Sequence, residues 1–142
     1  MIKSVILGEE IIIETGNKVG LLADIAMALS NEGVNIEAAS GYEVAKTATL
    51  MLVTNANLRI VGMLKKKKYK SVREAEVILV DLENKPGALK VVTTELTKAK
   101  IDIKHLYVTS PSNGHSSKMV ILTSDNERAM AVLNNYAQQG AV

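Results

Sequence analysis

The sequence of 142 residues contains no cysteine, phenylalanine or tryptophan, and only two prolines and two histidines. The lack of cysteine excludes disulfides, thiolate zinc sites and cysteine nucleophiles. Two histidines make a histidine-rich metal site improbable, and we expect neither a metal nor another cofactor. No segment has the pattern of a signal peptide or a membrane span, so we expect a cytoplasmic protein that does not act at a membrane.

Aromatic residues are also scarce, at 3% of the chain, which argues against the stacking platforms that bind single-stranded nucleic acid. The net charge of +2 is unevenly distributed, because six basic residues lie between Lys65 and Arg73. The other 11 basic residues are outnumbered by 15 acidic ones. Lysines near a helix end usually form a solvated surface. We therefore expect no nucleic-acid partner. Nucleic-acid binding ranks only third among the functional hypotheses, after the two stated below.

An internal repeat organises the chain. The segment Asn17–Leu22 recurs as Asn84–Leu89 at an offset of 67 residues, and six of the twenty aligned pairs that begin there are identical. After a slip of two residues the offset becomes 69, and residues 50–54 match residues 119–123. The two extra residues fall in Ser110–Gly114, a turn-rich segment where an insertion costs little stability. Further identical pairs are Asn57/Asn126 and Arg59/Arg128.

Each half predicts the order β-α-β-β-α-β of a ferredoxin-like unit. Apolar residues at helical spacing predict the buried side of the first helix in each half, with Gly33 as a C-cap and Pro86 in a first helical turn. These buried positions are Leu22, Ile25, Ala26 and Leu29, and then Leu89, Val92, Thr93 and Leu96. The predicted strands cover residues 10–14, 34–39, 47–54, 70–73, 76–82, 101–108 and 118–123. The second helices cover residues 57–67 and 126–136, whereas a last strand within 138–142 is doubtful.

The two loop segments, with Gly33-Val34-Asn35-Ile36 and Lys100-Ile101-Asp102-Ile103 downstream, resemble the ACT domain. The resemblance covers nearly the whole chain as a tandem pair. It implies an α+β fold of two βαββαβ units, with antiparallel sheets packed by helices on one face. The first ACT-like domain is expected at residues 1–72 and the second at residues 73–142.

The loop also has a direct physical interpretation. A helix N-terminus offers unpaired N–H groups and partial positive charge, which suit a carboxylate. Gly20 and Gly87 allow the backbone to approach a ligand closely. Asn17 and its counterpart Asn84 can donate to that carboxylate or cap the helix. An acceptor at the next strand, Asn35 or Asp102, can bind an ammonium group, so the pattern suits a free amino acid.

The resemblance implies a ligand held between two ACT units. Members with a histidine two residues before the loop asparagine differ from this chain, which has Thr15 and Leu82 there. Val19 replaces the usual loop proline, and Asp102 replaces the usual asparagine, so the two pockets are not expected to be equivalent. The implied ligand-binding residues are Asn17, Val19, Gly20, Leu21, Leu22, Asn35, Ile36, Asn84, Pro86, Gly87, Ala88, Leu89, Asp102 and Ile103.

Simpler roles compete with these assignments. Helix capping competes with ligand binding for Asn17 and Asn84, and close helix-to-sheet packing is the favoured role of the loop glycines. His105 and His115 have no carboxylate at a spacing that indicates a triad, so no catalytic residue is predicted.

The leading hypothesis is a non-enzymatic, amino-acid-binding regulatory protein, with a homodimer expected. The alternative is a regulatory small subunit that acts by contact on an amino-acid biosynthetic enzyme.

Overall fold

The computed structural model describes residues 1–111 and 114–139. It divides into two compact units, which we call the first-repeat unit (Glu9–Ala75) and the second-repeat unit (Met1–Gly8 with Glu76–Val142). The expected boundary between residues 72 and 73 lies close to the observed division. That boundary, however, assigned the first eight residues to the first repeat, whereas the structure groups them with the second.

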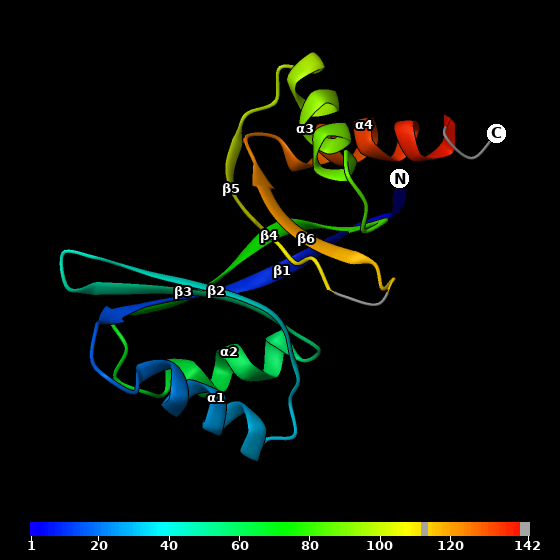
Figure 1. Ribbon diagram of the computed structural model, residues 1–142. Helices are drawn as coiled ribbons and strands as arrows, with labels where there is room; N and C mark the ends of the chain where they lie inside the picture. Colours follow the sequence, from blue (N-terminus) through cyan, green and yellow to red (C-terminus); the bar gives the residue numbers. More distant parts are fainter. Residues whose placement is uncertain (112–113, 140–142) are drawn as a thin grey trace. The chain divides into compact units, whose positions relative to one another are not determined.

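Ten elements follow one another along the chain (Figure 1). The strands pair in the order β2-β3-β1-β4-β6-β5. The first five elements are β1 (Ile2–Gly16), α1 (Leu21–Asn31), β2 (Ile36–Val44), β3 (Thr47–Thr54) and α2 (Asn57–Lys65). The others are β4 (Ser71–Leu82), α3 (Ala88–Lys98), β5 (Ile103–Val108), β6 (Ser117–Thr123) and α4 (Asn126–Gln139).

Strands β1 and β4 are long because each contributes to both units. In the first-repeat unit, the second part of β1 is the first strand and the start of β4 is the last. In the second-repeat unit, β4 supplies the first strand, and residues 2–8 of β1 occupy the place of the last. The second repeat therefore takes its final strand from the N-terminus. In the segment where a last strand was doubtful, residues 138–139 end α4, and residues 140–142 lie outside the described residues.

The core of the first-repeat unit lies between its strands and one layer of helices, α1 and α2 (Figure 1). Leu21, Ile25 and Leu29 form the buried stripe of α1, which agrees with the predicted stripe at Ile25 and Leu29. The prediction was wrong for Leu22, whose side chain is 49% exposed. The buried positions of α1 are spaced by four residues, so the buried stripe begins one residue before the predicted start.

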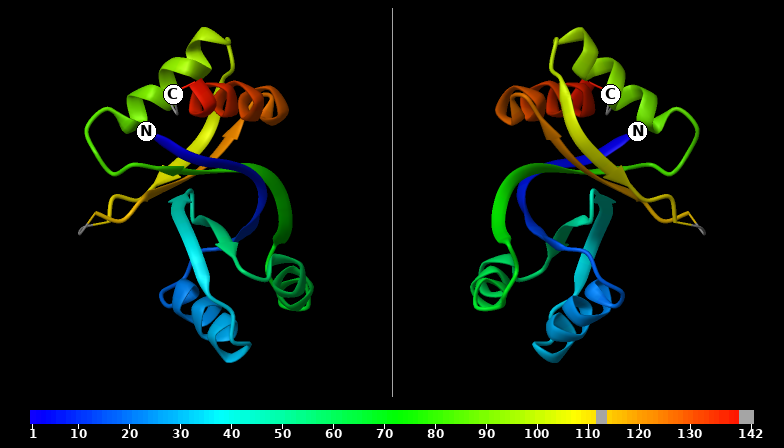
Figure 2. Two further views of the ribbon diagram at one scale, coloured as in Figure 1. Left: turned by 90° about the vertical axis from the view of Figure 1, so that its right-hand side faces the viewer. Right: turned by 90° about the vertical axis from the view of Figure 1, so that its left-hand side faces the viewer.

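The second-repeat unit has the same layers, with α3 and α4 over one face of its strands (Figure 2). Ala88, Val92 and Leu96 are buried in α3, and Leu89, which was expected in this stripe, is 43% exposed. Ile2 and Val5 belong to this core, which explains why the N-terminal residues group with the second repeat.

Two of the repeated identities have a structural role that both units share. The Asn57 side chain accepts hydrogen bonds from Thr54 N–H (2.9 Å) and Thr54 Oγ1 (2.7 Å), and donates to the carbonyl of Glu9 (2.6 Å). Asn126 makes the equivalent three bonds in the second repeat, to Thr123 and Glu76. Likewise, the guanidinium groups of Arg59 and Arg128 donate to carbonyls just beyond α1 and α3, those of Glu32 (3.0 Å) and Ala99 (2.8 Å).

Candidate functional site

The repeated loop forms the same turn before α1 and α3. Leu21 N–H donates to the Lys18 carbonyl (3.3 Å), and Gly20 between them has φ 88° and ψ 0°. Ala88 N–H donates to the Lys85 carbonyl (3.2 Å), with Gly87 at φ 90° and ψ −8°. These are the angles of the third residue of a type II turn, which favours glycine there.

This turn corrects the prediction for Pro86. It lies before the N-cap Gly87, at the second position of the turn, and not in the first turn of α3, which begins at Ala88. Proline is favoured at that turn position because its φ is already fixed near the required value.

The loop glycines serve backbone conformation and not close packing. A Cβ placed on Gly20 would meet no atom within 4 Å, and one on Gly87 would meet only the Met1 side chain at an ordinary 3.5 Å. The favoured packing explanation is therefore wrong for both residues. Their positive φ angles explain the glycines instead.

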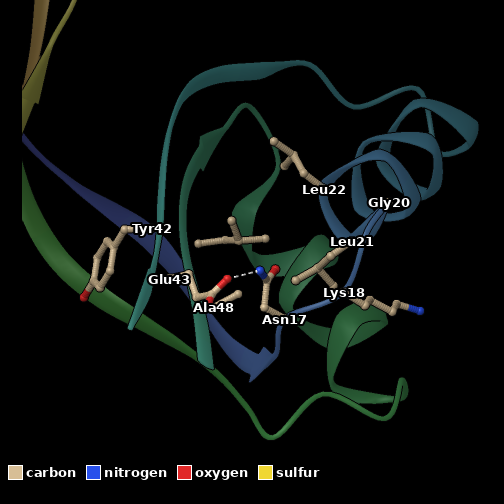
Figure 3. Close-up of a pocket in the computed structure, with 9 residues that line it drawn as sticks. Asn17, Lys18, Gly20, Leu21, Leu22, Tyr42, Glu43 and Ala48 are labelled. Atoms are coloured by element: carbon tan, nitrogen blue, oxygen red, sulfur yellow. Dashed lines mark hydrogen bonds between the residues drawn. The ribbon is translucent and has the colours of Figure 1, made fainter. Parts of the chain in front are cut away.

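Neither loop asparagine caps its helix, because Gly20 and Gly87 are the N-caps and no side-chain cap hydrogen bond is made. The Asn17 side-chain amide instead donates to the carboxylate of Glu43 (Figure 3), and its backbone N–H donates to the Lys46 carbonyl (2.8 Å). Glu43 lies near the end of β2, beside the two-residue turn Ala45–Lys46 that leads into β3. The loop is thus tied to the β2–β3 hairpin.

A cavity of about 320 Å³ opens at this junction, entirely within the first-repeat unit (Figure 3). Leu21, Ala48 and Leu50 supply buried apolar surface, whereas Leu22 and Tyr42 are half exposed. The full lining is Asn17, Lys18, Gly20, Leu21, Leu22, Tyr42, Glu43, Ala48 and Leu50. We call it the loop cavity. Its volume is in the range of small-molecule sites.

The polar groups of the loop cavity differ in sign. The first turn of α1 presents N–H groups that have no acceptor within the helix, together with the positive end of the helix dipole. Glu43 supplies a negative charge from the hairpin. The Lys18 side chain extends away from Asn17 (Figure 3), and its ammonium lies 3.6 Å from the carboxylate of Asp24. The cavity therefore pairs a helix N-terminus with one carboxylate over apolar surface.

In the second-repeat unit, the loop asparagine has different hydrogen-bond partners. Asn84 donates to the carbonyl of Pro111 and accepts from the hydroxyls of Ser110 (2.8 Å) and Ser117 (3.2 Å). In the repeat alignment, Ser110 corresponds to Glu43, and Ser117 corresponds to Ala48. The second repeat thus has hydroxyls bonded to its loop asparagine where the first has a carboxylate and a methyl group.

The remaining predicted site residues lie apart from the loop cavity. Val19 is fully exposed and does not line it. Asn84 borders another cavity, with Lys3 and Glu83, and Gly87 borders a third, with Met1 and Tyr136.

The predicted strand-start residues belong to separate hydrogen-bonded corners. Asn35 N–H donates to Asn55 Oδ1 (3.2 Å), and Asp102 N–H donates to Ser124 Oγ (3.1 Å). Asp102 also pairs with Lys104 at 3.1 Å. Asn35 and Ile36 do not line the loop cavity, and Asp102 and Ile103 do not line the two cavities that Asn84 and Gly87 border.

The sequence did not indicate four residues of the loop cavity, which are Tyr42, Glu43, Ala48 and Leu50. They come from the hairpin that follows α1, and the repeat alignment gives no sign of them because Glu43 and Ala48 differ from their counterparts.

In the part of the chain that the structure describes, no group of histidine and acidic side chains is arranged to hold a metal ion. No helix there is both long enough and apolar enough to span a bilayer.

No protein-family model and no curated protein matches the sequence. Solved structures, however, match almost all of it. Protein BT0572 from Bacteroides thetaiotaomicron is 23% identical, with a TM-score of 0.84 over 94% of this chain and 90% of that one. The regulatory subunit of aspartate kinase from Thermus thermophilus is 10% identical, with a TM-score of 0.64 over 95% and 98% of the two chains.

The aspartate kinase of Clostridium acetobutylicum is similar over only part of its length. It is 16% identical, with a TM-score of 0.53, and the match covers 95% of this chain and 34% of the enzyme. At such identities these likenesses establish the fold alone. The chain accordingly has the tandem ACT-like fold, with two βαββαβ-like units in one polypeptide, the second of which takes its last strand from the N-terminus.

Proposed function

We propose that the protein is a non-catalytic regulatory protein that binds a free amino acid in the loop cavity of its first repeat. The observation that carries this proposal is the juxtaposition of the α1 N-terminus and Glu43 across apolar surface. A free amino acid carries one group of each charge on neighbouring atoms, and the cavity offers one site for each.

Each part of the ligand has a counterpart in the cavity. The α-carboxylate accepts hydrogen bonds from the first-turn N–H groups of α1, where the helix dipole favours an anion. The α-ammonium group pairs with Glu43. The side chain lies against Leu21, Ala48 and Leu50, so the proposed ligand is an amino acid with an apolar side chain.

Binding at this place has a route to regulation. Glu43 is held by Asn17 in the free protein, so a ligand ammonium group competes for the carboxylate that ties the loop to the β2–β3 hairpin. A ligand shifts a conformational equilibrium only when it binds the two states with different affinity. Loss of the hydrogen bond between the Asn17 side chain and Glu43 supplies that difference.

The second candidate is a regulatory subunit that acts by contact on an amino-acid biosynthetic enzyme. It is favoured by the occurrence of this fold both as a separate aspartate kinase subunit and as about a third of an aspartate kinase chain. Co-purification of a larger enzyme with the tagged chain would support it. A homodimer formed through an edge strand stays a prediction, and light scattering of the purified chain tests it.

Titration calorimetry with each common amino acid tests the ligand proposal. At a hundred times its Kd, a ligand adds about 2.7 kcal/mol of stability, which thermal unfolding also detects. Glu43→Gln should weaken binding by about tenfold or more, since it removes the charge that pairs with the ammonium group. The matched control is Glu37→Gln, an exposed carboxylate on the same strand that does not line the cavity. No binding by any amino acid at millimolar concentration would contradict the proposal.

A further inference from the structure

A second cavity of about 360 Å³ lies in the first-repeat unit and shares Lys18 and Leu21 with the loop cavity. Lys67 and Lys68 also line it, together with Tyr69 and the end of β1 at Gly16. We call it the lysine cavity. Among the described residues that line it, three are cationic and none is acidic.

The positive charge at the lysine cavity is only partly compensated. Lys18 pairs with Asp24 at 3.6 Å, whereas Lys67 and Lys68 make no ion pair with any described residue. Burial, and secondarily the charge of Asp24, raises the pKa of Tyr69, so its hydroxyl is protonated and can donate a hydrogen bond at neutral pH. Three lysines against one carboxylate leave two positive charges around one hollow.

A favourable interaction with the helix dipole does not account for the whole of this arrangement. That interaction acts within the last turn of a helix, and α2 ends at Lys65, the one basic residue of its last turn. Lys67 and Lys68 follow the helix, where Lys67 N–H bonds back to the Leu64 carbonyl (3.0 Å). They meet Lys18, which comes from the loop before α1, at a single cavity. The charges from two separate segments therefore converge on one place.

We propose that the lysine cavity binds the phosphate group or groups of a small phosphorylated molecule. Lysine ammonium groups bind phosphate as point charges, and the Tyr69 hydroxyl adds a neutral donor. Convergence on one hollow favours a small molecule over a nucleic-acid strand, which needs an extended track of charge and commonly uses aromatic stacking. This site adjoins the proposed amino-acid site through Lys18 and Leu21, but Lys67 and Lys68 line only the lysine cavity.

Calorimetry with inorganic pyrophosphate on the full chain, at about 150 mM salt, tests this proposal. The double variant Lys67→Gln/Lys68→Gln should bind pyrophosphate at least about tenfold more weakly than the parent. The matched control is Lys66→Gln/Lys70→Gln, which removes the same charge from flanking exposed lysines that do not line the cavity. Its affinity should stay within about twofold of the parent.

Absence of pyrophosphate binding at millimolar concentration would overturn the proposal. Equal weakening in both double variants would also overturn it, because it would indicate diffuse attraction. A single-stranded oligonucleotide forms the comparison arm. Tighter binding of the oligonucleotide than of pyrophosphate, weakened alike by both variants, would assign the lysines to nucleic acid instead. Glu43→Gln should leave pyrophosphate affinity unchanged, so the amino-acid site and the phosphate site can fail independently.

Discussion

Gly33 and Lys100 occupy the same position after α1 and α3, and both have a left-handed backbone, with φ 71° and 57°. Gly33 N–H donates to the Ser30 carbonyl (2.9 Å), and Lys100 N–H donates to the Thr97 carbonyl (3.0 Å). Gly33 thus ends the first helix as the sequence predicted. In the second repeat, Lys100 makes the same turn. A residue with a Cβ is disfavoured in this left-handed conformation.

We predict that Lys100→Gly stabilises the protein by about 0.5–1 kcal/mol, since relief of the left-handed strain exceeds the entropy that glycine adds to the unfolded chain. Gly33→Ala should destabilise it by about 1 kcal/mol. Urea unfolding of both variants measures the two effects. A loss of stability in Lys100→Gly would contradict the assigned strain.

Asn57 and Asn126 should be equally important to stability, although they lie in different units. Each half-buried amide holds a threonine and a strand carbonyl by three hydrogen bonds, and alanine leaves those groups unpaired. We expect each alanine variant to lose about 2 kcal/mol of unfolding free energy. Asn135→Ala, on the exposed side of α4, is the control and should change stability by less than about 0.5 kcal/mol. If either alanine variant lost as little unfolding free energy as the control, the three hydrogen bonds of that asparagine would be dispensable.

The carboxyl group of Glu74 should make stability depend on pH. The hydrogen bond that a protonated Glu74 can donate to Glu9, then burial and the Glu9 charge, raises the pKa of Glu74, and Lys65 opposes the shift. Glu74 Oε2 is buried without a hydrogen-bond partner among the described residues. A raised folded-state pKa stabilises the protein at acidic pH, and that contribution is lost as pH rises through the folded-state pKa.

Glu74→Gln should therefore be more stable than the parent at pH 7, by at most about 1 kcal/mol, because it removes the like-charge contact. The difference should shrink as the pH falls below the ordinary glutamate range. Thermal unfolding from pH 4 to pH 8 checks this, with Glu76→Gln as an exposed control on the same strand. A pH-independent difference would rule out the carboxyl pair as its cause.

The repeat explains how much of the fold could be predicted. The apolar residues of each helix and strand have a characteristic spacing, and both halves of the chain show the same order of elements. Residues 47–54 were therefore predicted as the strand that the structure shows as β3. The N-terminal strand could not be assigned to its unit in this way. Ile2, Val5 and Ile6 do not alternate, and the place of Ile2 and Val5 in the second-repeat core depends on pairing with a segment about seventy residues away.

The candidate site was less predictable, because its important contacts are not local. The turn and its glycine can be read from Asn17-Lys18-Val19-Gly20, but the partner of Asn17 lies 26 residues later, on another strand. The same loop in the second repeat meets Ser110 and Ser117 instead. The two similar loops therefore have different surroundings, set by residues that no pattern in the loop specifies.

The central claim is that an amino acid binds at the loop of the first repeat and not at that of the second. Amide chemical shifts of the isotope-labelled full chain, recorded during titration with apolar amino acids, test it directly. The account predicts shifts at Gly20, Leu21, Leu22 and Glu43 that saturate together, and none at Gly87, Ala88 and Leu89. Saturable shifts confined to the second loop, or no shift at either loop, would contradict it.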